Sequence, residues 1–273
     1  MPVILSTTLL PSPSRRIRSI GASAIPAPPP LKCCPTLTAA TDTGRDPTTA
    51  ARPTGVKLSD VSSSREPAPH RRWPACVLAT AVLLFLLLTW QVVAQGPLAR
   101  ADRRLSGDLV RPDRVSGVLA DLGNVSVAVP VLAVVLVCAA WRARRAGTRR
   151  WWLPSVAAAA LMAVVPAVVV PLKDLVARPG PPVMGPATGF FPSGHTATAA
   201  IAYGSAALVL WPWLRTSCAR RGVLLACLAL NLGVAFGLVR HGYHWPLDVV
   251  ASWCLCAVLL TGLAVFLARH DRP

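Results

Sequence analysis

The sequence predicts an all-α, polytopic membrane protein: a six-transmembrane-helix bundle that follows a disordered N-terminal tail. Of its 273 residues, 53% are hydrophobic and only 14% are charged, and the mean hydropathy is +0.52. This composition lies outside the usual range of soluble domains and is typical of chains embedded in a bilayer. From Trp73 onward, apolar runs of membrane-spanning length follow one another, and arginine clusters mark alternate ends of them.

The first 72 residues differ from the rest of the chain. They are rich in Pro, Ser, Thr, Ala and Arg and show no sustained periodicity, so we expect residues 1–72 to be disordered. This tail is either a regulatory or tethering segment or an over-extended reading frame. The predicted membrane domain covers residues 73–268, and residues 269–273 form a short cytoplasmic tail.

Six spans are predicted because a run of about 20 apolar residues is long enough to cross the hydrocarbon core. Prolines 154, 166 and 171 fall in the third span, where they can kink a transmembrane helix without excluding it. Residues 96–114 carry balanced charges and are expected to be a polar connector. The predicted spans are 73–95, 122–141, 152–172, 195–214, 223–239 and 247–268.

The distribution of arginine predicts the topology. Residues 142–150 contain five arginines and no acidic residue, which is typical of a cytoplasmic loop. The net charge of +17 would also suit a nucleic-acid-binding protein, but the arginines flank apolar spans, so no nucleic-acid partner is predicted. With six crossings, residues 173–195 and 240–248 then share the extracytoplasmic face.

A polar motif, Pro192-Ser193-Gly194-His195, directly precedes the fourth span. Ser193 is a favourable helix N-cap, and Gly194 lets a ligand approach the backbone. The start of a helix suits an anion such as phosphate, because its N–H groups are unpaired and its dipole is positive there. His195 would stand at this anion site and exchange a proton near neutral pH. Taken alone, a histidine at a helix start is more often structural.

A second candidate pair is His244 and Asp248, spaced i, i+4 at the start of the sixth span. On a helix the two side chains share one face, and a carboxylate on one ring nitrogen raises the basicity of the other. His244 is therefore a candidate nucleophile or base. The alternative is that His244 only caps the sixth span and that Asp248 is simply its hydrogen-bond partner.

Basic residues complete the set. Lys173 and Arg178 are candidates for holding phosphate oxygens, although such residues also snorkel at span ends.

The eight cysteines are scattered and have no histidine spacing that would suggest zinc. The phosphate loop Gly-x-x-x-x-Gly-Lys is absent as well. We therefore predict no metal and no cofactor.

This pattern resembles the type 2 phosphatidic acid phosphatase family, which shares a superfamily with vanadium haloperoxidases. The family motifs are Lys-x6-Arg-Pro, Pro-Ser-Gly-His and Ser-Arg-x5-His-x3-Asp, and they match here at Lys173, at residues 192–195 and at His244 with Asp248. The resemblance implies a six-helix core. It also implies that His244 attacks phosphorus, that Asp248 orients it and that His195 protonates the leaving group. Lys173, Ser193 and the Gly194 amide would bind phosphoryl oxygens.

Two family arginines are missing from this chain. Gly180 and Leu238 occupy their expected places, and Gly237 replaces the serine of the third motif. Arg178 and Arg240 each lie two residues away, and we hypothesise that they substitute as phosphate ligands.

The resemblance implies metal-independent hydrolysis of a lipid phosphate. We expect an integral protein of a bacterial plasma membrane, and the arginine topology predicts that its site lies on the extracytoplasmic face. Two alternatives use the same residues: a phosphotransferase, and a non-catalytic lipid-phosphate binder or transporter. Retention of His195, His244 and Asp248 argues against mere binding, because binding needs no oriented nucleophile. A soluble vanadate-dependent peroxidase is disfavoured by the six spans.

Overall fold

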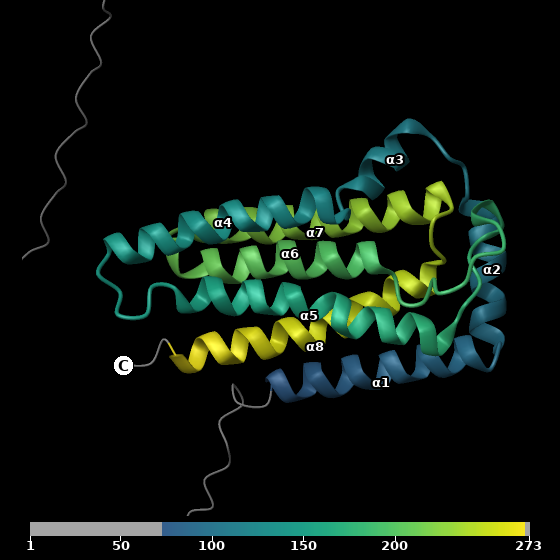
Figure 1. The fold of residues 1–273 in the computed structure, drawn as a ribbon, viewed down its shortest axis with the longest axis horizontal. Coiled ribbons are helices and arrows are strands. Elements are labelled where there is room, and N and C mark those ends of the chain that lie inside the picture. Colours follow the sequence, from purple (N-terminus) through teal and green to yellow (C-terminus); the bar gives the residue numbers. More distant parts are fainter. Residues whose placement is uncertain (1–72, 271–273) are drawn as a thin grey trace, which may run out of the picture. The chain divides into compact units, whose positions relative to one another are not determined.

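The computed structural model describes residues 73–270, which form a bundle of helices (Figure 1). The predicted tail, residues 1–72, and the last three residues lie outside this described part. The helices are α1 (Trp73–Val93), α2 (Pro97–Leu109), α3 (Arg114–Asp121), α4 (Val125–Arg145), α5 (Leu153–Val176), α6 (Gly194–Leu210), α7 (Ser217–His241) and α8 (Pro246–His270), with short 3₁₀ turns η2 (Pro182–Met184) and η3 (Trp211–Trp213).

Five of the six predicted spans are helices long and apolar enough to cross a membrane. These are α1, α4, α5, α7 and α8, which have 21–25 residues each and mean hydropathies of 2.2–2.4 over their most apolar windows. The predicted fourth span is the shorter helix α6, with 17 residues, and η3 follows it directly. The all-α membrane fold is confirmed, and the count of six full-length spans is not.

Helix α6 lies at the centre of the bundle, in contact with α4, α5, α7 and α8 (Figure 1). Its sequence is dominated by small residues, and most of them are buried. Small side chains let neighbouring helices approach closely within a membrane. At Gly204 the approach is so close that a β-carbon would lie 2.6 Å from a methyl carbon of Leu260 on α8. The central position of α6 fixes where its N-terminus, with the Ser-Gly-His motif, is held.

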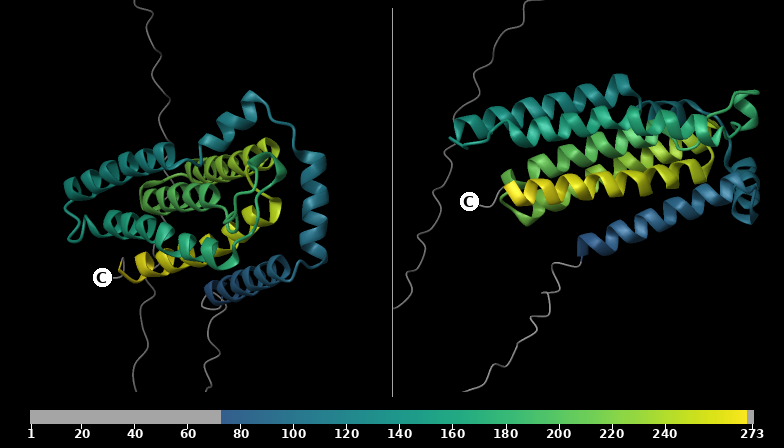
Figure 2. Two further views of the ribbon diagram at one scale, coloured as in Figure 1. Left: turned by 45° about the vertical axis from the view of Figure 1, so that its right-hand side comes forward. Right: turned by 60° about the horizontal axis from the view of Figure 1, so that its bottom comes forward.

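The predicted connector at residues 96–114 is instead mostly helical, which corrects that expectation. Pro97 occupies the first turn of α2, where its missing N–H costs nothing. The buried face of α2 consists of Ala99, Asp102 and Ser106. Because these side chains are small or polar, they give no apolar periodicity by which a helix would be predicted. Both views in Figure 2 place α2 across one end of the bundle, between α1 and α3.

The three polar clusters of the sequence lie at this same end. The α5–α6 connection and the α7–α8 turn both lie beside α2, while the α4–α5 and α6–α7 connections lie at the opposite end (Figure 1). The connection between α5 and α6 folds back on itself through an antiparallel bridge of Pro179 with Thr188. The expectation that the clusters share one end of the bundle is confirmed.

Candidate active site

The turn between α7 and α8 positions the first histidine. Helix α7 ends at Gly242, whose φ of +81° is the left-handed conformation that a glycine tolerates best. Four residues later α8 begins at Pro246, and Asp248 lies in its first turn. The Asp248 Oδ2 atom lies 3.3 Å from His244 Nδ1 and accepts a hydrogen bond of 3.2 Å from the Trp245 N–H. The i, i+4 pair expected from the sequence is formed.

Both members of this pair are buried. Asp248 is fully buried, and His244 is only 5% exposed. A carboxylate at Nδ1 favours the tautomer with the proton on that nitrogen, which leaves the Nε2 lone pair free. The ring edge of His244 also packs against Phe190, with 5.6 Å between the ring centroids. These contacts hold the imidazole in one orientation.

The start of α6 brings in the second histidine. Ser193 caps the helix: its Oγ accepts hydrogen bonds from the Thr196 N–H (3.3 Å) and from the Thr196 hydroxyl (3.0 Å). The Ser193 N–H donates to the Asp248 carbonyl oxygen (3.2 Å), which ties α6 to the first turn of α8. As a result, the ring centroids of His195 and His244 lie 6.5 Å apart. The two histidines are therefore near neighbours at the same end of the bundle.

Lys173, in the last turn of α5, lies beside the start of α6. A β-carbon built on Gly194 would lie 4.0 Å from Lys173 Nζ. The first N–H groups of a helix have no partners within it, and the positive end of the helix dipole adds to the charge of the ammonium group. Positive charge from two sources, the Lys173 ammonium group and the start of α6, therefore meets next to His195.

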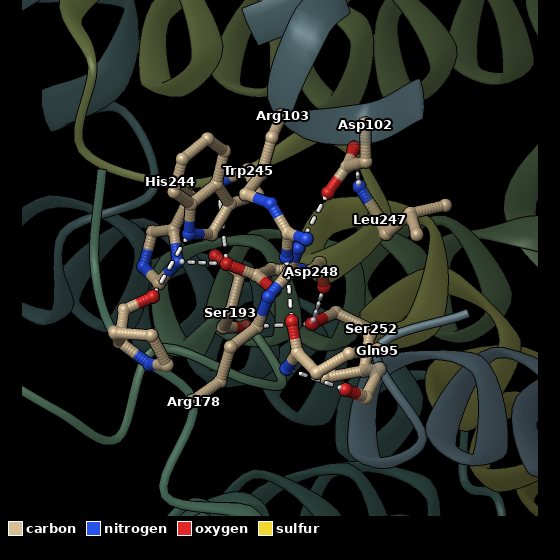
Figure 3. A network of polar contacts seen from close by, with 12 residues as sticks. Gln95, Asp102, Arg103, Arg178, Ser193, His244, Trp245, Leu247, Asp248 and Ser252 are labelled. Atoms are coloured by element: carbon tan, nitrogen blue, oxygen red, sulfur yellow. Dashed lines mark hydrogen bonds and ion pairs between the residues drawn. The ribbon is translucent and has the colours of Figure 1, made fainter. Parts of the chain in front are cut away.

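The Arg178 side chain is already paired with other residues, which corrects its expected role as a phosphate ligand. Its side chain is 3% exposed and lies between two carboxylates, as Figure 3 shows. Nη1 donates to Asp248 Oδ1 (2.5 Å), and Nη2 donates to Asp102 Oδ2 (2.7 Å). The guanidinium thus acts on His244 only through Asp248.

Arg240 also forms an ion pair, in this case with Asp113. Its Nε donates to Asp113 Oδ2 (2.7 Å), at the cap of α3, and both side chains are partly exposed to solvent. The hydrogen bond from Arg240 lowers the pKa of Asp113 to about 2, helped by the Ser116 N–H. The structure therefore does not support the hypothesis that Arg178 and Arg240 replace the missing arginines as phosphate ligands.

The three places where this chain departs from the family motifs are closely packed. A β-carbon on Gly180 would lie 2.6 Å from the Phe190 ring, which is the ring that contacts His244. Leu238 is fully buried in the main hydrophobic cluster. At Gly237 a β-carbon would lie 2.4 Å from the Ala120 nitrogen, because α3 packs directly on α7 there. A larger side chain at Gly180 would therefore meet Phe190, and one at Gly237 would meet α3.

Asp102 is a site residue that the sequence did not single out. It reaches the site from α2, where its carboxylate accepts hydrogen bonds from Arg178 and from the Leu247 N–H (3.0 Å) (Figure 3). Burial raises the pKa of Asp102, while the hydrogen bond from Arg178 opposes this change. In the sequence it is one of several charges in an apparent connector, so only the folded chain reveals its partners.

An apolar cleft of about 730 Å³ opens from the site between α4 and α5. Its polar end consists of Lys173, Gly194, His195 and Thr198. Apolar side chains of the two helices, such as Leu132 and Val169, form the rest. No group of three or more His, Cys, Asp or Glu side chains within residues 73–270 is arranged to hold a metal ion.

These features define an integral membrane protein in which Lys173 and His195 line the end of an apolar cleft, with the His244–Asp248 pair beside His195. Residues 154–272 match the family model of the PAP2 superfamily, so the resemblance to the type 2 phosphatidic acid phosphatases is confirmed over the part that carries all three motifs. No curated protein matches the sequence significantly.

A solved structure supports the same fold. The chain is similar to the crystal structure of the first transmembrane PAP2 type phosphatidylglycerolphosphate phosphatase from Bacillus subtilis, with a TM-score of 0.60 and 22% sequence identity. The similarity covers 71% of this chain and 97% of that one. Together the family match and the fold support a membrane phosphatase.

Proposed function

We propose that this protein hydrolyses a lipid phosphate monoester or pyrophosphate through a phosphohistidine intermediate, without a metal ion, on the extracytoplasmic face. The observation that carries the proposal is the 6.5 Å separation of the His195 and His244 rings, with Asp248 on the far side of His244. A nucleophile held by a carboxylate opposite a second proton-transfer group is what covalent phosphoryl transfer requires.

In the first step, Nε2 of His244 attacks phosphorus and forms a P–N bond. The P–O bond to the lipid alkoxide breaks, and protonated His195 donates its proton to that oxygen. Asp248 stabilises the positive charge that develops on His244. Lys173 and the first N–H groups of α6 stabilise the negative charge on the phosphoryl oxygens, and the Ser193 hydroxyl keeps one hydrogen to donate there.

In the second step, water attacks the phosphohistidine and the P–N bond breaks. His195, now neutral, accepts the proton of this water, so inorganic phosphate leaves and both histidines return to their starting states. If an alcohol replaces water, the same chemistry gives a phosphotransferase.

The cleft between α4 and α5 is the reason for proposing a lipid. Lys173 and His195 line its polar end, and its apolar walls suit an acyl or prenyl chain. Candidate substrates are phosphatidic acid, phosphatidylglycerophosphate, a polyprenyl (pyro)phosphate and a prenyl-linked sugar phosphate. The phosphatidylglycerolphosphate phosphatase named above has the same fold, which favours the lipid class.

The proposal is tested by offering the purified protein in detergent a panel of these lipid phosphates and measuring inorganic phosphate. We expect release that persists after metal chelation. Binding of a lipid phosphate without release would instead identify a binder or transporter.

A tryptophan at Ala133 tests the role of the cleft. Ala133 is an exposed residue of α4 that lines the cleft, whereas its neighbour Val134 is exposed outside it. Blocking contacts equivalent to about two methylene groups should raise KM for a lipid phosphate about tenfold. Ala133→Trp should therefore raise KM for the lipid but not for a short soluble phosphate monoester, and Val134→Trp should change neither. Equal effects of the two variants would exclude the cleft as the lipid site.

A further inference from the structure

Asp102 lies in α2, outside all three family motifs, yet it is part of a buried chain of charges that ends at His244. The chain runs from Asp102 to Arg178, from Arg178 to Asp248 and from Asp248 to His244, with contacts of 2.7, 2.5 and 3.3 Å (Figure 3). The side chains of Asp102, Arg178 and Asp248 are 2%, 3% and 0% exposed. Solvent therefore does little to screen these charges from one another.

The charge balance of this chain gives Asp102 a specific effect. Arg178 alone would neutralise Asp248, and the carboxylate would then stabilise a positive His244 less strongly. With Asp102 bound to the other side of the guanidinium, the three groups carry a net charge of −1. Asp102 therefore restores the negative charge that the nucleophile requires when it becomes cationic on attack.

Asp102 also acts on the backbone. Its Oδ1 accepts a hydrogen bond from the Leu247 N–H, one residue before Asp248 and in the first turn of α8. The Asp102 carboxylate thus contacts both Arg178, which binds Asp248, and the first turn of α8, in which Asp248 lies. The contact also joins α2, which lies across the end of the bundle, to the site.

We propose that Asp102 is a positioning residue for the reaction, which maintains the orientation and the negative charge of Asp248 behind His244. This inference rests on the proposed function, because it assigns a role within the same site. It predicts that activity depends on a residue of α2 that touches no substrate.

The test is Asp102→Asn, which keeps an oxygen for the Leu247 N–H but removes the charge. We expect kcat to fall about 10–100-fold, by analogy with outer-shell residues that orient a metal-binding histidine, with little change in KM. Asp108→Asn is the matched control, because Asp108 is an exposed acid of the same helix. Asp102→Glu should recover part of kcat because it restores the charge.

A second measurement does not need turnover. In protein with ¹⁵N-labelled imidazoles, His244 should carry its proton on Nδ1, and the signal of this proton should move upfield in Asp102→Asn but not in Asp108→Asn. An unchanged kcat together with an unchanged His244 signal would overturn the role of Asp102. If the protein releases no phosphate at all, the proposed function fails, and the ring signal alone decides about Asp102. If Asp102→Asn does not fold, the same two measurements on Asp102→Ser, which also removes the charge, decide.

A separate observation concerns a cavity at the opposite end of the bundle. It has a volume of about 660 Å³ and lies between the α4–α5 connection, η3 and the end of α8. Along α5, Leu153 at this cavity is about 30 Å from Lys173, at 1.5 Å per residue. The cavity is therefore independent of the phosphatase site.

The cavity combines an apolar wall with a cationic and aromatic rim. Leu208 and Leu267 are among the apolar side chains, while Arg149, Arg150 and Trp151 lie at the rim. None of its lining residues is acidic, and neither arginine forms an ion pair with another residue of the described chain. Uncompensated arginines next to tryptophan at the end of transmembrane helices are typical of sites for anionic lipid headgroups.

We infer that this cavity binds a phospholipid with an anionic headgroup, whose phosphate contacts Arg149 and Arg150 and whose acyl chain covers the apolar wall. The apolar wall is the reason for choosing a lipid of the bilayer rather than a soluble anion. Such binding would stabilise the folded protein by mass action.

The experiment measures the unfolding temperature in detergent with added phosphatidylglycerol, phosphatidylcholine or glycerol phosphate. Both lipids are phosphodiesters, so they are not substrates of the proposed monoesterase. Phosphatidylglycerol should raise the unfolding temperature by about 5 °C. Arg149→Gln/Arg150→Gln should abolish this rise, whereas Arg215→Gln/Arg221→Gln, which removes equal charge outside the cavity, should keep it. An equal rise in both double variants, or with glycerol phosphate, would overturn the inference.

Discussion

Replacing His244 by alanine is expected to abolish phosphate release from every substrate, with a loss of at least about 10⁴-fold in kcat. The reason is that no other described residue pairs a free imidazole nitrogen with a buried carboxylate in the way that His244 does with Asp248. The variant should still bind the lipid phosphate, because Lys173 and the start of α6 remain.

His195→Gln distinguishes the role of His195 in the reaction from the role of His244. It should lower turnover of an alkyl lipid phosphate about 10²–10⁴-fold, the usual contribution of a general acid. A nitrophenyl phosphate does not need this acid, because nitrophenolate leaves without a proton. His195→Gln should therefore release one nitrophenolate per protein molecule rapidly and then stall as phosphohistidine.

The control is His241→Gln, because His241 contacts Ser116 of α3 and not His195 or His244. It should leave both reactions near the level of the unchanged protein. Rapid quench with acid or alkali then identifies the intermediate, since a phosphohistidine is lost in acid and survives alkali. If His195→Gln slows the nitrophenyl burst as much as the lipid reaction, His195 is not the acid.

The parts of the site that could be predicted from the sequence are those set by local spacing. His244 and Asp248 are four residues apart, and the cap of α6 by Ser193 is a short-range contact. The apolar runs likewise predicted which segments form the long helices. Topology alone then brought the motifs to one end of the bundle.

The errors concern contacts between residues far apart in the sequence. Arg178 lies 76 residues from Asp102, and Arg240 lies 127 residues from Asp113, so neither partner could be found by spacing. The sequence predicts a connector where Asp102 and Asp113 lie, so it gives no sign that these two carboxylates bind the arginines. Helix α2 was missed for a related reason, since its buried face of Ala99, Asp102 and Ser106 is not apolar.

Arg178→Ala is expected to destabilise the protein by about 3–5 kcal/mol, because it leaves Asp102 and Asp248 buried without their cation. Activity should also fall steeply, since Asp248 would lose the group that fixes its position behind His244. Arg240→Ala should cost only about 0–1 kcal/mol and keep most activity, because its ion pair with Asp113 is partly exposed. Denaturant unfolding and steady-state kinetics of the two variants check this contrast.

A double variant distinguishes this role from phosphate binding. If Arg178 serves Asp102 and Asp248, then adding Asp102→Asn to Arg178→Ala removes one unpaired buried charge and should recover part of the lost stability. The two changes would thus be non-additive, as expected for groups in direct contact. If Arg178 instead binds phosphate, Arg178→Ala should raise KM with little loss of stability, and Asp102→Asn should not rescue it. The buried position of Arg178 between two carboxylates predicts the first result.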